Sequence, residues 1–61
     1  MNKQSKEIIH NALYELGQYA DLKLQGYMMD NLPYEHAMVQ TAIRMKTLAN
    51  TALTELNKPN R

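Results

Sequence analysis

The sequence predicts an all-α protein: an antiparallel helical hairpin that dimerises into a four-helix bundle. Three observations lead to this fold class. Two long segments carry apolar residues at helical spacing, a short break containing a proline separates them, and a single domain of 61 residues is too small to cover both segments well. Because the chain has no cysteine and only two histidines, oligomerisation is the remaining source of added stability.

The first helix is predicted from about residue 5 to residue 29. Asn2 or Ser5 can cap its start, because their side-chain oxygens accept free amide hydrogens of the first turn. Gly17 lies at the edge of the apolar stripe, where a missing side chain lets a neighbouring helix approach. At about 100° per residue, the stripe lies within about 60° of one line. It consists of Ile9, Leu13, Leu16, Ala20, Leu24 and Tyr27.

The second helix is predicted from about residue 33 to residue 57, after a turn at about residues 30–32. Pro33 suits a first helical turn, because its missing N–H would have no partner there. Asn31 or Leu32 would then be the cap, and with Leu32 the side chain of Glu35 forms half of a capping box. Residues 58–61 are expected to be a frayed tail. The apolar stripe of this helix consists of Met38, Ala42, Met45, Ala49, Ala52 and Leu56.

The two stripes together form the predicted dimer core. The first is bulky, whereas the second alternates alanine with larger side chains, so the helices can interdigitate. The short turn makes the two helices of one chain antiparallel. A second copy of the chain would place four helices around one core, so the first expected partner is the protein itself.

Neither catalytic chemistry nor a bound cofactor is indicated by the sequence. Glu7 and His10 have the spacing found in carboxylate-bridged metal bundles, but both are predicted to point away from the bundle interior. His36 beside Glu35 is interpreted as a surface histidine. No nucleophile with a matching base and no glycine-rich phosphate loop is present. We therefore expect no enzymatic activity, no cofactor and no metal.

Some apolar residues lie outside the two stripes. Tyr14 and Leu22 interrupt the polar side of the first helix, and Val39 and Ile43 extend beyond the stripe of the second. They either widen the dimer contact or form a patch that recognises another protein. Tyr14, Leu22 and Ile43 are the candidate partner-binding residues, and the partner would be a protein that the sequence does not identify.

The charge pattern does not favour nucleic acid as a partner. Seven basic and six acidic residues give a net charge of +1, which provides no broad electrostatic attraction for nucleic acid. One pole of the hairpin would gather four basic residues and could make weak phosphate contact. These residues are Lys3, Lys6, Lys58 and Arg61. No membrane span and no secretory signal is visible, so we expect a cytoplasmic protein without a membrane partner.

Two resemblances follow from these features. In size, lack of cysteine and hairpin pattern, the whole chain resembles the repressor-of-primer family, whose helical-hairpin dimers bind paired RNA loops. This resemblance implies that RNA contact would involve Asn11, Tyr14, Gln18 and Gln25. Residues 8–16 are similar to small accessory proteins from the early region of lambda-like temperate phages, which implies a regulatory role through protein contacts in the host cytoplasm.

The leading hypothesis from sequence is a non-enzymatic regulatory or adaptor protein that acts by docking on another protein. The alternative is a regulator that binds structured RNA or DNA with the outer face of the paired first helices. A third hypothesis is a structural module whose only partner is itself.

Overall fold

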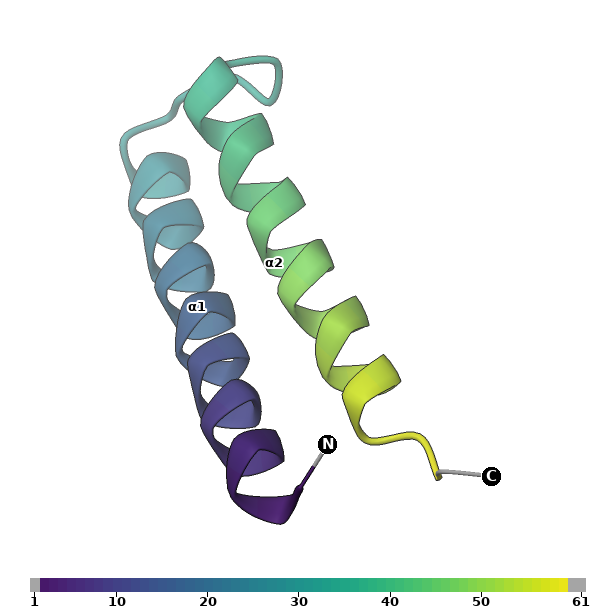
Figure 1. The fold of residues 1–61 in the computed structure, drawn as a ribbon. Coiled ribbons are helices and arrows are strands. Elements are labelled where there is room, and N and C mark those ends of the chain that lie inside the picture. Colours follow the sequence, from purple (N-terminus) through teal and green to yellow (C-terminus); the bar gives the residue numbers. More distant parts are fainter. Residues whose placement is uncertain (1, 60–61) are drawn as a thin grey trace.

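The computed structural model describes residues 2–59, which form two helices, α1 (Lys3–Met29) and α2 (Ala37–Leu56). The helices run antiparallel and side by side, so that both chain ends lie at the same pole (Figure 1). The Cα atoms span 44 × 18 × 13 Å, which is the shape of one layer of two helices. The predicted helical hairpin is therefore confirmed. Over residues 2–59, neither helix has a stretch long and apolar enough to cross a bilayer.

Helix α1 begins two residues earlier than predicted, because Asn2 provides the cap. The Asn2 side-chain oxygen accepts the backbone N–H of Ser5 at 2.8 Å. Asparagine is among the strongest capping residues, because its short side chain reaches an amide hydrogen that lacks a partner within the helix. Of the two candidate caps named from sequence, the first is the one that forms.

The end of α1 is fixed by a left-handed residue. Asn31 has a φ of 61°, a conformation that asparagine tolerates better than most residues. Its N–H donates to the carbonyl of Met28, and the Leu32 N–H donates to the carbonyl of Tyr27, each at 3.0 Å. These two bonds are the Schellman arrangement, which satisfies carbonyl groups at the end of a helix. The chain therefore reverses direction directly after α1.

Helix α2 begins at Ala37 and not near Pro33, which corrects the predicted boundary. The cap is His36, whose Nδ1 accepts the backbone N–H of Met38 at 3.1 Å. The His36 N–H donates to the Pro33 carbonyl at 3.0 Å, so residues 33–36 close a separate turn. The cap of α2 is therefore His36, and not Asn31 or Leu32 as predicted. The helix ends at Leu56, one residue before the predicted end.

A second hydrogen bond ties this connecting turn to α2. The Gln40 side-chain amide donates to the Tyr34 carbonyl at 2.7 Å. The predicted half capping box between Leu32 and Glu35 does not form at the start of α2, because both residues precede the helix. The connection is therefore longer than the three residues expected, and it is organised by side chains of α2 and its cap.

The two helices meet along a narrow line that we call the seam. Its residues recur at alternating steps of three and four, the spacing by which paired helices keep one edge in contact. The small side chains of Ala20, Val39, Ala42 and Ala49 are buried, and the other seam residues are half-buried. The seam consists of His10, Leu13, Gly17, Ala20, Leu24 and Tyr27 on α1, and of Val39, Ala42, Lys46, Ala49, Leu53 and Leu56 on α2.

Gly17 permits the close approach of the helices that its position suggested. A Cβ atom built on Gly17 would lie 3.6 Å from the Cβ of Ala49. With glycine and alanine at the point of contact, the backbones approach closely but little apolar surface is covered. Because the apolar area removed from water drives folding, the seam alone provides modest stability.

The seam is rotated relative to the stripes predicted from sequence. Val39, which was placed beyond the stripe of the second helix, is only 4% exposed, whereas Met38 is 48% exposed. On α1, Ile9 and Leu16 likewise remain exposed. On each helix, some of the apolar residues pack against the other helix of the chain, and the others face outward. Whether these outward residues form a dimer core stays a prediction.

Candidate protein-docking surface

A second line of mostly apolar residues runs beside the seam on each helix, and we call the two lines together the apolar face. They also recur at steps of three and four, displaced by one residue from the seam. On α1 the line lies one position before His10, Leu13, Gly17, Ala20 and Leu24. The face consists of Ile9, Ala12, Leu16, Tyr19 and Lys23 on α1, and of Met38, Thr41, Met45, Leu48 and Ala52 on α2.

Most of the large side chains of the apolar face are exposed to solvent, and Met45 is half-buried. The exposed fractions are 54% for Tyr19, 42% for Leu16 and 68% for Leu48. Isolated exposed apolar residues are common, but a contiguous apolar surface on a small protein marks an interaction site. A helix with two adjacent apolar lines has one line more than a single neighbour covers.

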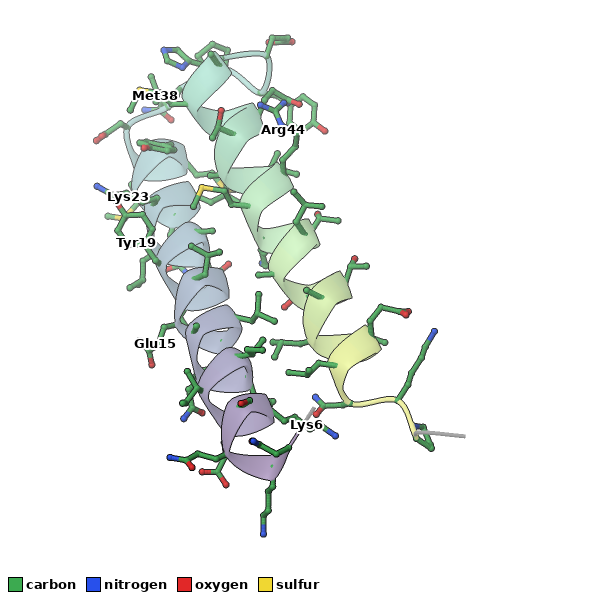
Figure 2. The ribbon with its side chains drawn as sticks, viewed as in Figure 1. Lys6, Glu15, Tyr19, Lys23, Met38 and Arg44 are labelled. Atoms are coloured by element: carbon green, nitrogen blue, oxygen red, sulfur yellow. The ribbon has the colours of Figure 1, made fainter. Side chains whose placement is uncertain are left out.

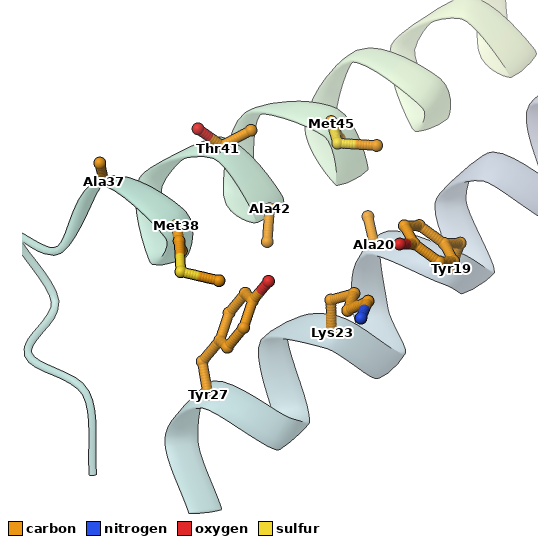
Figure 3. Close-up of a pocket in the computed structure, with 9 residues that line it drawn as sticks. All are labelled: Tyr19, Ala20, Lys23, Tyr27, Ala37, Met38, Thr41, Ala42 and Met45. Atoms are coloured by element: carbon orange, nitrogen blue, oxygen red, sulfur yellow. The ribbon is translucent and has the colours of Figure 1, made fainter. Parts of the chain in front are cut away.

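A groove of about 300 Å³ lies at the end of the apolar face nearer the connection. Tyr27 and Met38 extend toward one another across it, and Ala20 and Ala42 form its floor (Figure 3). The lining is apolar apart from the Thr41 and tyrosine hydroxyls and the Lys23 amine. Such a lining can receive an apolar side chain and offers no cluster of acids and bases for catalysis.

Lys23 is the one cation that lies on the apolar face, and it stays close to an aromatic ring. Its Nζ lies 5.5 Å from the centre of the Tyr19 ring, within the range of a cation–π interaction. Figure 2 shows both side chains on the same side of α1. The aliphatic part of Lys23 therefore adds to the apolar face while its charge remains at the edge.

The opposite side of the hairpin is polar, and we call it the polar face. A groove on this face is lined by Tyr14, Gly17, Gln18, Asp21, Lys46, Asn50 and Leu53. Its central contact is an ion pair in which the Lys46 Nζ lies 2.7 Å from the Asp21 carboxylate. The hydrogen bond and the charge of Lys46 lower the pKa of Asp21 below its ordinary value. Gln25 donates a further hydrogen bond to this carboxylate at 3.1 Å.

The three candidate partner-binding residues do not form one patch. Tyr14 is 51% exposed and lines the polar groove. Leu22 is 65% exposed and lines a different groove, together with Tyr19 and Tyr27. Ile43 is half-buried beside the seam. The three residues therefore lie on different surfaces of the hairpin, and whether they bind a partner stays a prediction.

The residues considered for metal or phosphate binding lie near the chain ends. His10 is half-buried at the seam, which corrects the expectation that it points away from the other helix. It borders a groove with Lys3, Lys6, Glu7 and Asn57. No cluster of three or more His, Asp or Glu side chains suited to a metal occurs among residues 2–59.

The predicted basic pole is only partly present. Lys58 lies 2.6 Å from the Glu55 carboxylate, which reduces its effect as a free cation. Lys3 and Lys6 are exposed, and Arg61 lies outside the described residues. The cations therefore do not form a continuous surface with the polar groove.

No protein-family model, curated protein or solved structure matches the chain. The class of protein defined by the fold and the surface is thus a small helical hairpin with one uncovered apolar face.

Helical periodicity identifies most of the exposed apolar residues but does not show that they divide into two lines. Tyr19 and Leu48 are exposed, and they belong to the line that runs beside the seam. The signal in the sequence is how widely the apolar residues spread around each helix, because they occupy two adjacent lines and not one.

Proposed function

We propose that the chain is a non-enzymatic protein-docking module that pairs with a second copy through its apolar face. The pair forms a four-helix bundle and acts as a small regulatory or adaptor protein through contacts with another protein. The observation that carries this proposal is the exposed second line of apolar residues on both helices. In a four-helix bundle each helix contacts two neighbours, and two adjacent lines on each helix match that need.

The amount of exposed surface supports the same proposal. The chain exposes 4993 Å² of solvent-accessible surface, whereas a compact protein of this mass exposes about 4100 Å². The excess of about 900 Å² is close to the ~800 Å² that each partner buries in a standard interface. A single layer of two helices also lacks the second layer against which domains normally bury an apolar face.

Pairing through the apolar face leaves the polar face on the outside of the bundle. Tyr14, Gln18 and Asn50 would then be available to a further protein, and Leu22 would lie at the edge of the pair. A tyrosine flanked by amide side chains combines apolar area with adaptable hydrogen bonding, as protein-recognition surfaces commonly do. We therefore assign partner recognition to the polar face and retain Tyr14 as its central residue.

Nucleic-acid binding has less support and is not proposed as the main function. Two of the described cations, Lys46 and Lys58, are paired with carboxylates of the same chain. On the polar face, Asp21 also lies between the residues that would approach a phosphate backbone. The remaining cations do not provide the continuous basic surface that nucleic-acid binders use.

Sedimentation equilibrium over a dilution series from micromolar to millimolar concentration tests the pairing. We expect a mass of two chains that falls to one chain on dilution, with helical content falling in parallel. Leu48→Gln on the apolar face should weaken pairing, whereas Asn50→Gln on the polar face is a matched control. A stable, fully folded single chain throughout the series would contradict the proposal.

A second measurement tests the role of the polar face. Pull-down from the source cell with the wild type and with Tyr14→Ala should capture a protein that the variant loses, while both retain the mass of two chains. Equal capture by Tyr14→Ala and loss by Leu22→Ala would move the recognition site to the edge of the apolar face.

A further inference from the structure

We propose that the two copies are related by a twofold axis that lies in the contact between their apolar faces and crosses the helices at right angles. We call it the crosswise axis. Helix α1 of one copy then lies antiparallel on α1 of the other, and α2 lies on α2 in the same way. This inference rests on the proposed pairing and specifies its arrangement. It places Leu16 of each copy in the groove of the other and pairs Glu15 with Lys23 between copies.

Only two kinds of twofold axis suit a four-helix bundle built from two such hairpins. Two apolar faces are brought together by a twofold axis only when that axis lies in the plane between them. The helices of a four-helix bundle lie within about 20° of parallel or antiparallel. The axis must therefore run either across the helices or along them, and we call the second possibility the lengthwise axis. The crosswise axis places the connection of one copy over the chain ends of the other, whereas the lengthwise axis places both connections at the same pole.

The contacts within one chain define which residues of α1 and α2 lie at the same level along the hairpin. Gly17 lies against Ala49, and Asp21 pairs with Lys46. The two residue numbers of each pair add up to 66 or 67, because the helices are antiparallel. Any residue of α1 is therefore level with the residue of α2 that completes this total.

This rule also locates the middle of the apolar face. The face extends from the level of Ile9, near the chain ends, to the level of Met38, near the connection. Tyr19 and Leu48 are level with each other and lie midway between these two limits. A crosswise axis at this level exchanges the two halves of the face, so that the face is covered along its whole length. Two residues of α1 from different copies then meet when their numbers add up to about 38.

The two halves of the apolar face differ in shape, and the crosswise axis brings unlike halves together. The half toward the connection contains the groove of about 300 Å³, with Ala20 and Ala42 at its floor (Figure 3). The half toward the chain ends carries the exposed side chains of Ile9 and Leu16. The crosswise axis brings Leu16 of the second copy to a level between the two alanines, so that its side chain enters the groove. The lengthwise axis sets one groove against the other and leaves both unfilled, which the close packing of protein interiors disfavours.

The charges beside the apolar face also favour the crosswise axis. Glu15 and Lys23 lie on the same side of α1, one turn before and one turn after Tyr19 (Figure 2). Their numbers add up to 38, so the crosswise axis brings Glu15 of each copy level with Lys23 of the other. Within residues 2–59, neither side chain forms an ion pair in its own chain. The crosswise axis therefore creates two ion pairs between the copies.

The lengthwise axis produces the opposite charge pattern. It stacks α1 of one copy on α2 of the other without changing their levels, and Lys23 is then level with Arg44. Like charges meet twice across the contact, whereas Glu15 lies level with Ala52, which has no charge. Because like charges across an interface disfavour it, the charge pattern selects the same axis as the groove does.

Distances between spin labels distinguish the two axes. The natural chain has no cysteine, so a label can be attached to one introduced thiol. Glu7→Cys, near the chain ends, and Gln18→Cys, near the middle of α1, both replace exposed residues outside the apolar face. With the crosswise axis the two Glu7 positions are about 36 Å apart along the helices, because each is about 12 residues from the axis at a rise of about 1.5 Å per residue. The two Gln18 positions are nearly level.

Pulsed electron paramagnetic resonance on each labelled variant measures the separation between the two copies. We expect the separation of the Glu7→Cys labels to exceed that of the Gln18→Cys labels by about 20 Å. A difference below about 10 Å would indicate the lengthwise axis and overturn the crosswise one, while leaving the proposed pairing intact. A single-chain mass for the wild type would instead overturn the pairing itself.

Charge reversal tests the ion pairs independently of the labels. Lys23→Glu should raise the dissociation constant of the pair about ten-fold, because the new carboxylate meets Glu15 of the other copy. Adding Glu15→Lys should return the constant to within about three-fold of the wild type, and this rescue should diminish at about 1 M salt, where charges are screened. With the lengthwise axis, Lys23→Glu would tighten the pairing, because the carboxylate would meet Arg44. A Lys23→Glu variant that pairs as well as the wild type or better would therefore contradict the crosswise axis.

Discussion

The polar face and the apolar face of this hairpin are built from the same two helices. They differ in whether their side chains find partners within one chain. On the polar face, the Lys46 Nζ lies 2.7 Å from the Asp21 carboxylate, and the Gln25 side chain donates a hydrogen bond to the same carboxylate. On the apolar face, Leu16 and Leu48 have no such partner and remain exposed. Charged groups in contact with water need only a neighbour, whereas apolar side chains need a second layer. This difference is the basis of the proposal that a second copy covers the apolar face.

The seam between the faces explains why the imbalance persists. Its closest contact is between Gly17 and Ala49, which brings the backbones together without covering large side chains. The larger residues of the seam, such as Leu13 and Leu24, are only half-buried. Among residues 2–59 the buried side chains are therefore small, whereas large apolar side chains such as Leu16 and Leu48 stay exposed.

The largest expected effect comes from placing a charge on the apolar face. Leu16→Glu should raise the dissociation constant of the pair at least about 100-fold, because an unpaired carboxylate would be buried in the contact. Gln18→Glu introduces the same group on the polar face and should leave the mass of the pair unchanged. Sedimentation equilibrium measures both. Equal loss of pairing in the two variants would remove the distinction between the faces.

A change at the seam should alter the stability of the hairpin itself more than the pairing of two copies. Gly17→Leu should lower the free energy of unfolding by about 2 kcal/mol, because the side chain cannot fit against Ala49. Gly17→Ala should raise it by up to about 1 kcal/mol, since its Cβ would make an ordinary contact at 3.6 Å and alanine favours helices.

Urea denaturation at fixed protein concentration measures these two changes. Gly26→Ala is the control, because no atom lies within 4 Å of the added Cβ, so the helix preference alone acts. A Gly17→Leu variant as stable as Gly17→Ala would show that the helices do not approach closely at this point.

A change at the connection lies outside both faces and should alter stability without altering the contact between copies. Asn31→Ala should lower the free energy of unfolding by about 1 kcal/mol, because alanine disfavours a φ of 61°. Asn31→Gly should be neutral or slightly stabilising. Thermal unfolding monitored by circular dichroism gives the comparison, and reversal of the order of these variants would argue against the left-handed cap.

The smallest effect is expected from the ion pair of the polar face. Because Lys46 lowers the folded-state pKa of Asp21 below its unfolded value, the pair stabilises the fold at neutral pH. This contribution is lost as the pH falls below about 4, through the folded pKa. The melting temperature of wild type should therefore exceed that of Asp21→Asn at pH 7, and the gap should shrink as the pH falls below the ordinary aspartate pKa of about 3.9. A gap that widens at low pH would contradict the lowered pKa.

Local sequence signals were sufficient for much of the backbone but not for the connection. The residue at which α1 ends and the capping role of Asn2 could both be inferred from side-chain chemistry within a few residues. The start of α2 could not, because Pro33 and His36 both offer plausible beginnings. The competition is resolved by a hydrogen bond from the Met38 N–H to His36 and by one from the Gln40 side chain to the Tyr34 carbonyl, which exist only when the turn is already folded.

By itself, the sequence determined two amphipathic helices, their antiparallel order and an excess of apolar residues, because helical periodicity and the proline-containing break are properties of neighbouring residues. Only the tertiary structure decided which of two adjacent apolar lines lies inside the hairpin. Both lines have the same spacing and similar hydrophobicity, so periodicity cannot rank them. The choice depends on backbone distance, and Gly17 opposite Ala49 lets the helices meet along the line that exposes Leu16, Met38 and Leu48.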